Sequence, residues 1–179
     1  MRALLFFILF LSNSLLADVV FDPYIGTPFG TAKLEDQIES DISGLGIGGR
    51  VYYEYFNFFG GIDLKLSANN ADSPDRDYEQ NQLGLLGGVQ FPFAPIRVWT
   101  SFYFLDVMSV SPSGYDYKGG GYAFGLGFSP LPFMSINMEY KGSTYDEVEK
   151  PAGDEMLTNE AELSSLFISL SFLFRSSVI

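Results

Sequence analysis

The sequence predicts an all-β protein, a membrane-spanning, eight-stranded antiparallel up-and-down β-barrel. Apolar and polar residues alternate with a period of two in eight segments of strand length. The connections between these segments alternate between short and long, and in the clearest segment the polar face carries only small side chains. Because a strand directs successive side chains to opposite faces, the alternation indicates strands whose two faces meet different environments.

The eight strands are predicted from this alternation. In residues 120–129, large apolar side chains share one face, and glycine, alanine and serine occupy the other. A tilted strand needs about 9 to 11 residues to cross a bilayer, and the segments reach that length. Pro23 and Pro28 interrupt the first strand, because proline has no N–H for the ladder. The predicted strands are residues 20–32, 43–55, 58–68, 81–91, 96–107, 120–129, 133–144 and 162–174.

The connections alternate in composition as well as in length. The short ones are rich in phenylalanine and proline, whereas the long ones are polar and concentrate the acidic residues. Short turns at one end and long loops at the other are typical of a bacterial outer-membrane barrel, with the short turns in the periplasm. The short connections are 55–58, 91–96 and 129–133, and the long ones are 33–42, 69–80, 108–119 and 145–161.

The residue types on the two faces favour a barrel in lipid over a sheet in water. Soluble β-sandwiches and barrels also alternate, so periodicity alone does not decide. Glycine weakens a strand and covers nothing, so Gly121, Gly125 and Gly127 are unexpected on a water-facing sheet. Small side chains suit the narrow lumen of an eight-stranded barrel, and large apolar ones suit acyl chains. A soluble secreted β-sandwich is the alternative.

The first 17 residues are predicted to be a secretory signal peptide. Arg2 precedes an apolar run from Ala3 to Leu11, and a short tail ends at the small residue Ala17. The run is too short to span a bilayer as a helix, so we expect cleavage after Ala17. Residues 18–179 would form the outer-membrane β-barrel domain. A signal anchor or a buried helix is the alternative for the first segment.

The composition argues against several classes of function. The chain has no cysteine and no histidine, so it lacks thiolate metal ligands and the usual imidazole base. Its formal net charge of −12 makes it a poor partner for nucleic acid. A carboxylate pair such as Asp63 and Glu139 could in principle substitute for histidine, but structural ion pairing explains these residues better. We expect no catalytic residue, no metal site, no cofactor and no nucleic-acid partner.

Eight charged residues fall on the face that would line the lumen. Four are basic and four are acidic, and this balance permits pairing. Pairing is required because a buried charge without a partner costs several kcal/mol. The eight residues are Arg50, Glu54, Asp63, Lys65, Arg97, Asp106, Glu139 and Lys141.

The position of each charge along its strand divides this set. Counted from the short turns, Glu54 and Arg97 lie low, Asp106 lies high, and the other charges lie near mid-membrane. Arg50 and Asp63 lie on strands joined by a tight turn, which places them opposite or diagonal to each other. We hypothesise a central ionic network that plugs the lumen; small water pockets without direct pairing are the alternative. The network would consist of Arg50, Asp63, Lys65, Glu139 and Lys141.

Five larger side chains are also expected to face the lumen. We interpret them as filler for a narrow barrel, because an eight-stranded lumen is just wide enough to be packed with side chains. A path for small hydrophobic molecules is the alternative. The five are Tyr52, Leu86, Trp99, Tyr103 and Leu105.

The stretch GGGYAFGLGFSPLPFMSINMEYKGS, residues 119–143, resembles a strand, proline-containing turn and strand of a known family. That family is the small eight-stranded outer-membrane β-barrels, which include the OmpA transmembrane domain, OmpX, OmpW and opacity-type proteins. The resemblance implies a Gram-negative outer membrane, contact with its lipids and lipopolysaccharide, recognition by the outer-membrane assembly machinery, and a monomer. The C-terminus departs from the family pattern, because RSSVI follows the aromatic Phe174.

Two functions are consistent with these observations. The first is a structural or surface-interaction role with a plugged lumen and acidic extracellular loops. The second is a narrow pore or an OmpW-like passage for small molecules. Outer-membrane barrel enzymes use histidine, so no enzyme is expected. The segment DSPDRDYE, residues 72–79, offers oxygen ligands for calcium, but its spacing matches no recognised calcium loop and solvated charge explains it better.

Overall fold

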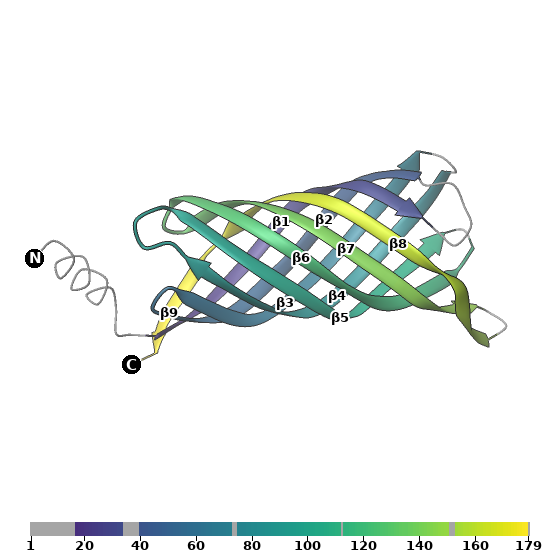
Figure 1. The fold of residues 1–179 in the computed structure, drawn as a ribbon. Helices are drawn as coiled ribbons and strands as arrows, with labels where there is room; N and C mark the ends of the chain where they lie inside the picture. The colour runs from purple at the N-terminus through teal and green to yellow at the C-terminus, as the bar shows by residue number, and fades with distance from the viewer. Residues whose placement is uncertain (1–16, 34–39, 73–74, 112, 151–152, 179) are drawn as a thin grey trace, which may run out of the picture.

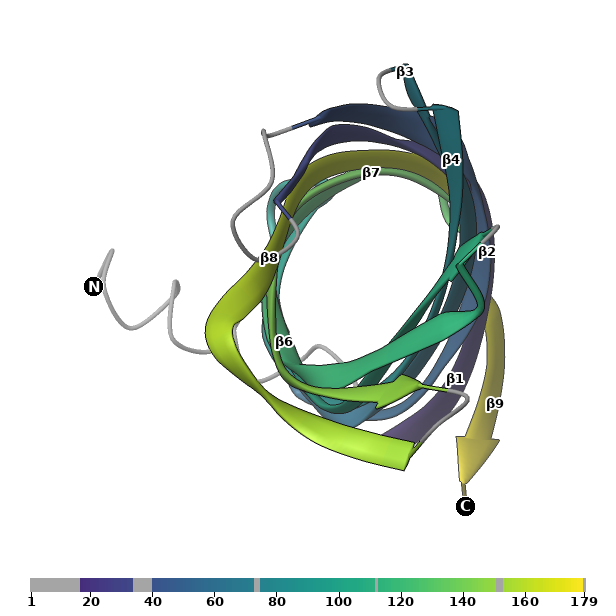
Figure 2. The same ribbon diagram turned by 90° about the vertical axis from the view of Figure 1, so that its right-hand side faces the viewer.

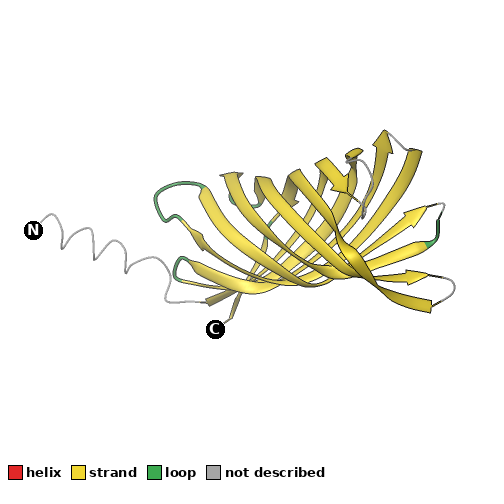
Figure 3. Ribbon diagram, turned by 45° about the vertical axis from the view of Figure 1, so that its right-hand side comes forward, coloured by secondary structure: helices red, strands yellow, loops and turns green. Residues whose placement is uncertain are grey.

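The structure, a computed structural model, consists of strands joined by brief connections (Figures 1 and 3). The predicted signal peptide falls almost wholly on residues 1–16, which lie outside the described part of the chain. In the part that is described, no helix is long and apolar enough to cross a membrane. The structure describes residues 17–33, 40–72, 75–111, 113–150 and 153–178.

The strands form one closed antiparallel barrel, which appears as a ring of ribbons when viewed from the end (Figure 2). Consecutive strands pair with each other, and β1 also pairs with β8, which closes the sheet. Strand β9 follows β8 after a break at Leu173. Both pair with β1 in the same register, so β9 extends β8 and is not a ninth strand of the barrel wall. The predicted eight-stranded barrel is therefore confirmed. The strands are β1 Ala17–Lys33, β2 Ser40–Tyr55, β3 Phe58–Asp72, β4 Asp75–Gln90, β5 Ile96–Ser111, β6 Tyr115–Leu131, β7 Met134–Lys150, β8 Gly153–Phe172 and β9 Phe174–Val178.

The two ends of the barrel differ. The short-turn end carries the β2–β3, β4–β5 and β6–β7 turns together with the start of β1 and the end of β9 (left in Figure 1). The far end carries the other four connections, which lie at 34–39, 73–74, 112–114 and 151–152.

The strands extend further toward the far end than predicted, and the expectation of long loops there is wrong. The predicted loop 69–80 is mostly a hairpin in which Asp72 pairs with Asp75. In the predicted loop 145–161, Lys150 pairs with Gly153. Pairing satisfies the backbone groups of the described parts of these segments, and the acids described there, Asp77, Glu79, Asp146, Glu147 and Glu149, lie on the outward face. The predicted strands ended too early because the polar, acidic composition of these segments is also typical of loops.

The barrel has two zones of opposite polarity. In the zone beside the short-turn end, here called the belt zone, large apolar side chains face outward and polar ones face the lumen. In the zone toward the far end, the cap zone, polar and acidic side chains face outward and apolar ones face inward. On the outward face, the last large apolar residue of the belt zone is followed by a small residue of the cap zone. This step lies between Leu45 and Ser43 on β2 and between Leu66 and Ala68 on β3. The inward core of the cap zone is Ala32, Ile42, Ala71, Tyr78, Met108, Val110, Tyr117, Tyr145, Val148, Ala161 and Leu163.

The belt zone is apolar on its outer surface around the whole barrel. Phe102 on β5 is 63% exposed and Phe124 on β6 is 59% exposed, and comparable side chains are found on the other strands. Monomeric soluble proteins rarely expose contiguous apolar surface beyond a few hundred Å². A surface of this kind is stable where an apolar medium covers it.

Pro28 of β1 leaves a gap in the ladder between β1 and β2, and a neighbouring hydroxyl fills it. Pro28 pairs with Phe167 of β8, but it has no N–H for the ladder on its β2 side. Thr27 Oγ1 instead donates to the carbonyl oxygen of Gly44 on β2, at 2.6 Å. The hydroxyl thus supplies a donor where the ladder lacks one.

A β-bulge in β5 lies near the boundary between the two zones. The register of β5 against β6 shifts between Tyr103 and Asp106, so Phe104 and Leu105 both face outward. The prediction that Leu105 faces the lumen is therefore wrong, and its side chain is 47% exposed. A bulge adds one residue to the strand and reverses the alternation beyond it, which brings Asp106 into the lumen as predicted.

Candidate functional site: the charged lumen

Glu139 on β7 joins two cations inside the belt zone. It accepts hydrogen bonds from Arg50 Nη2 at 2.5 Å and from Lys65 Nζ at 3.0 Å. All three side chains are at most 2% exposed. Charge-assisted hydrogen bonds are about twice as strong as neutral ones, and these are removed from water. Strands β2, β3 and β7 thus meet across the lumen at one carboxylate.

Asp63 on β3 accepts hydrogen bonds from several donors. Tyr24 OH donates to Oδ1 at 2.8 Å, and Tyr103 OH donates to Oδ2 at 2.9 Å. Ser101 Oγ donates to the same Oδ2 at 3.3 Å. Arg50 Nε lies 3.5 Å from Oδ2 and supplies the opposite charge. The carboxylate is therefore solvated by hydroxyl groups in place of water.

Asp22 on β1 is a lumen residue that the sequence reasoning missed. Its Oδ2 lies 2.9 Å from Arg97 Nη2 and 3.5 Å from Arg50 Nη1, and it is fully buried. The sequence does contain a signal for it, because Asp22 alternates in phase with Val20 and Tyr24, which also face the lumen. The prolines of this strand interrupt the polar pattern and obscured the alternation.

Arg97 was placed low in the lumen by the sequence, and the structure brings it to the central residues through Asp22. Its Nη1 donates to Tyr52 OH at 2.9 Å, and its Nη2 also donates to Asn137 Oδ1 at 3.0 Å and to Ser171 Oγ at 3.2 Å. Arg97 thus links β1, β2, β7 and β8 from β5.

Lys141 lies apart from the residues with which it was grouped. Its Nζ donates to Gln80 Oε1 at 2.6 Å and to Gln82 Oε1 at 2.9 Å. The amide nitrogens of both glutamines donate to Asp106, at 2.9 Å and 2.6 Å. Ser143 Oγ also donates to Asp106, at 2.6 Å. These five residues form what we call the amide relay, in which two neutral side chains bridge a cation and an anion.

Aromatic rings pack against the buried cations. The guanidinium carbon of Arg50 lies 4.3 Å from the ring centre of Tyr24 and 4.7 Å from that of Trp99. Lys65 Nζ lies 4.3 Å from the ring centre of Phe167. A ring face attracts a cation, more strongly where water is excluded. Gly125 leaves room for the Trp99 indole, because a Cβ at this glycine would overlap the ring.

The buried charges of the described lumen balance as four acids and four bases. The set differs from the predicted one at one position, because Asp22 is included and Glu54 lies at the rim instead. The buried set is Asp22, Asp63, Asp106 and Glu139 with Arg50, Lys65, Arg97 and Lys141. The structure brings together Arg50, Asp63, Lys65 and Glu139, and places Lys141 in the amide relay with Asp106.

Apolar layers lie on both sides of these charges. Toward the short-turn end, six buried residues pack into one cluster, and toward the far end the cap core packs above the amide relay. Tyr52, Leu86 and Trp99 were predicted as lumen filler, and they belong to the first of these clusters. The six residues are Val20, Tyr52, Phe59, Leu86, Trp99 and Leu173.

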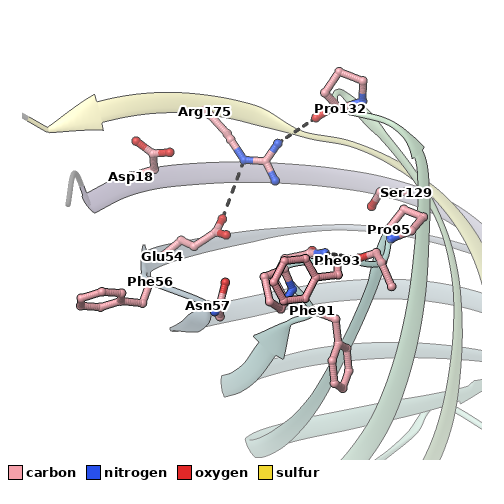
Figure 4. A pocket seen from close by; sticks show the side chains of 13 residues that line it. Asp18, Glu54, Phe56, Asn57, Phe91, Phe93, Pro95, Ser129, Pro132 and Arg175 are labelled. Carbon is pink, nitrogen blue, oxygen red and sulfur yellow. Dashed lines mark hydrogen bonds and ion pairs between the residues drawn. The ribbon is translucent and has the colours of Figure 1, made fainter. Parts of the chain in front are cut away.

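A vestibule of about 700 Å³ opens at the short-turn end (Figure 4). Glu54, placed low by the sequence, lies 3.8 Å from Arg175 Nε, and Arg175 Nη1 donates to the carbonyl oxygen of Pro132 at 2.8 Å. Phe91 and Phe93 of the β4–β5 turn form part of its wall. The pair at the rim is partly exposed, so solvent screening weakens it.

The carboxylates of the lumen are engaged with cations or hydroxyl donors and form no metal-binding cluster. In the described residues, no group of three or more Asp and Glu side chains is arranged to hold a metal ion. Asp63 and Glu139, the pair considered for chemistry, each have Arg50 as an ionic partner. The arrangement is one of matched charges that join opposite walls of the barrel.

Comparison with known proteins shows similarity of fold. No protein-family model and no curated protein matches the sequence. The structure of Neisserial surface protein A is similar with a TM-score of 0.61 at 13% identity, over 86% of this chain and 97% of that chain. The attachment invasion locus protein Ail of Yersinia pestis is similar with a TM-score of 0.61 at 10% identity, over 87% and 99%. A structure of Ail in complex with the heparin analogue sucrose octasulfate is similar with a TM-score of 0.57 at 14% identity, again over 87% and 99%. The chain therefore has the fold of the small eight-stranded outer-membrane β-barrels.

Proposed function

We propose that the protein is an integral outer-membrane β-barrel with a structural or surface-interaction role. In this proposal the belt zone spans the bilayer, the lumen is closed, and the acidic cap zone projects from the cell. The inversion of polarity between the two zones supports the proposal most strongly. A lipid-facing barrel is apolar outside, and a barrel in water is polar outside with an apolar core.

The proposed orientation places the short-turn end in the periplasm. Bacterial outer-membrane barrels have short periplasmic turns, and the cap zone would then lie outside the cell. Export through a signal peptide cleaved after Ala17, contact with lipopolysaccharide, and insertion by the outer-membrane assembly machinery as a monomer are parts of the same proposal. N-terminal sequencing of the protein recovered from outer membranes tests the cleavage site.

Closure of the lumen is supported by the stacking of unlike layers along the barrel axis. An ion would have to cross the apolar cluster around Trp99, the paired charges around Glu139 and the apolar cap core in turn. The two apolar layers exclude ions, and the paired charges between them occupy the polar space.

Planar-bilayer recording tests this closure against the alternative of a narrow pore. We expect no stepwise conductance from the refolded protein, in bilayers where a porin inserted as a control conducts. A heat-dependent shift in gel mobility reports separately that the barrel has folded. Stepwise conductance from folded protein would refute the plug and favour the narrow pore or OmpW-like passage, for which the vestibule at the short-turn end would be the entrance.

The charge of the cap zone suggests the chemistry of a surface partner. Eight acidic side chains and two basic ones are described on its outer face, so a cationic partner is favoured. The heparin analogue in the Ail complex is a polyanion, and the acidic cap argues against a similar ligand here. The acids are Asp41, Asp77, Glu79, Asp116, Asp146, Glu147, Glu149 and Glu162, and the bases are Lys33 and Lys118.

Binding to immobilised polymers tests this suggestion. Folded protein in neutral detergent should bind polylysine at low salt, lose it as salt is raised, and not bind heparin. Binding to heparin in preference to polylysine would contradict it.

A further inference from the structure

The charged side chains described around the vestibule are two acids and one base (Figure 4). Asp18 lies at the start of β1, Glu54 lies near the end of β2, and Arg175 lies on β9. The antiparallel register places Asp18 directly opposite Glu54. Like charges directly opposite each other on neighbouring strands are unfavourable. The vestibule thus has an excess of one negative charge.

Arg175 neutralises the two acids only in part. Its Nε lies 3.8 Å from Glu54 Oε2, which is too far for a hydrogen bond, and its Nη1 donates to the carbonyl oxygen of Pro132 instead. Asp18 Oδ1 is buried and has no hydrogen-bond partner in the described part of the chain. A buried acceptor without a donor is unfavourable. The lumen above the vestibule is balanced, with four buried acids and four buried bases, whereas the vestibule lacks one cation.

We propose that the α-ammonium group of Asp18, formed when the signal peptide is cleaved after Ala17, supplies this cation and pairs with Glu54. The inference rests on the cleavage site of the proposed function. Cleavage adds water across the peptide bond between Ala17 and Asp18. The new carboxylate leaves with Ala17, and the new amine stays on Asp18 and is mostly protonated at pH 7. Before cleavage this nitrogen belongs to an uncharged peptide group.

The register of β1 against β2 brings the ammonium group within reach of Glu54. Residues directly opposite each other on antiparallel strands have Cα atoms about 4.5–5.5 Å apart, and the nitrogen of Asp18 is about 1.5 Å from its own Cα. Both side chains line the same vestibule, so the carboxylate of Glu54 lies on the same face as that of Asp18. The side chain of Glu54 is only 17% exposed, so the pair is partly removed from water.

The pair would make the barrel respond to removal of its signal peptide. The first residue of a chain is poorly ordered unless it is tied down. In the processed protein, the ammonium group ties Asp18 to β2 and leaves two acids and two bases in the vestibule. In the precursor, the same acids face each other with Arg175 as their one described cation. Cleavage therefore completes the charge balance of the vestibule.

The reactivity of the α-amino group tests the proposal. Only the neutral amine is acylated, and a nearby carboxylate favours the charged form. Protein recovered from outer membranes is acylated at pH 7 in neutral detergent with a limiting amount of an N-hydroxysuccinimide ester, and mass spectrometry of the N-terminal peptide gives the rate at Asp18. A partly exposed ion pair corresponds to a factor of about two to five.

Three variants separate the charge of Glu54 from its other contacts. We expect E54Q to be acylated at least twofold faster than the wild type, because the carboxylate is lost. E54D keeps the charge and should react close to the wild-type rate. The control E149Q changes an acid near the far end of β7 and should also react at the wild-type rate. A heat-dependent gel shift of each variant shows that the rates belong to folded protein.

A second measurement needs no variant. The amine of the wild-type protein should react at least twofold more slowly in the folded barrel than in the urea-unfolded chain. Equal rates in these two states, or equal rates for wild type and E54Q in protein that begins at Asp18, would overturn the pairing while the membrane location and the cleavage site stand. A first residue other than Asp18 would overturn the cleavage site of the proposed function and the inference with it.

Discussion

Replacing Glu139 by glutamine removes the one charge that joins Arg50 to Lys65. The change keeps the volume of the side chain, so the effect is electrostatic rather than a cavity. Arg50 retains Asp22 and Asp63, whereas no other acid is described within ion-pair distance of Lys65. Removing one partner of a buried ion pair costs about 3–5 kcal/mol, because an uncompensated charge is left behind. We expect E139Q to lower the free energy of unfolding by about that amount.

The matched control is E149Q on the same strand. Glu149 pairs with Lys118 at 2.6 Å, a shorter distance than the 3.0 Å between Glu139 and Lys65. Its side chain is 50% exposed, however, and that of Lys118 is 37% exposed. Exposed ion pairs contribute about 0–1 kcal/mol, so burial rather than distance should decide the difference between the two variants.

Equilibrium unfolding in urea from lipid vesicles measures both variants. Trp99 is the only tryptophan of the chain and packs against Arg50, so its fluorescence reports on the lumen directly. The double variant K65M/E139Q should lose about 1–3 kcal/mol less unfolding free energy than the sum of the two single variants. The reason is that K65M also removes the Lys65 charge that E139Q leaves without a partner. If E139Q costs no more than E149Q, or if the two sites show no coupling, the reasoning from buried ion pairs is wrong.

Three further substitutions test other features of the barrel. Gln82→Leu removes one bridge of the amide relay and should cost about 1–3 kcal/mol in the same unfolding assay, since buried charged groups lose a partner; a cost near zero would show that the relay does not stabilise the lumen. Gly125→Ala forces the Trp99 indole to move, so it should cost about 1–3 kcal/mol and shift the fluorescence emission maximum. The control Gly87→Ala should leave the emission unchanged, because its Cβ would meet nothing closer than 3.9 Å. Equal spectra for both glycine variants would contradict the packing described. Thr27→Val removes the hydroxyl that joins β1 to Gly44 of β2 and should cost about 0.5–1.5 kcal/mol, while Thr100→Val on the outer face should be close to neutral. Equal effects of the two changes would mean that the Thr27 hydroxyl is dispensable.

The barrel and most of its lumen charges could be predicted because alternation assigns each residue to one of two faces. A buried charge such as Asp63 or Glu139 is conspicuous on the polar face, and the pairing of Arg50 with Asp63 follows from one tight turn. The cap zone was missed because its segments were assigned to loops on their polar, acidic composition. Its outer face is as acidic as a loop, although Tyr78 and Val110 continue the inward pattern.

Other features of the lumen depend on contacts between distant strands. Lys141 lies two residues from Glu139, yet its partners are Gln80 and Gln82, which are neutral and escape any count of charges. The outward turn of Leu105 depends on a bulge, and no turn residue or periodicity indicates where a bulge occurs. The order of the strands can be predicted from the sequence. To predict which side chains of opposite walls meet across the lumen, the register of every strand between them must also be known.

The boundary between belt and cap also has a consequence for bilayers of different thickness. A membrane helix adapts to a thicker or thinner bilayer by tilting, and long side chains at its ends reach the interface. Here the residues just above the last apolar ring include Asp41, Glu79 and Glu162, whose short carboxylates cannot extend out of the acyl region. We expect the barrel to keep a fixed depth and the surrounding lipids to stretch or compress instead. The protein would then sense membrane thickness poorly but alter it locally, which could influence which other proteins gather around it.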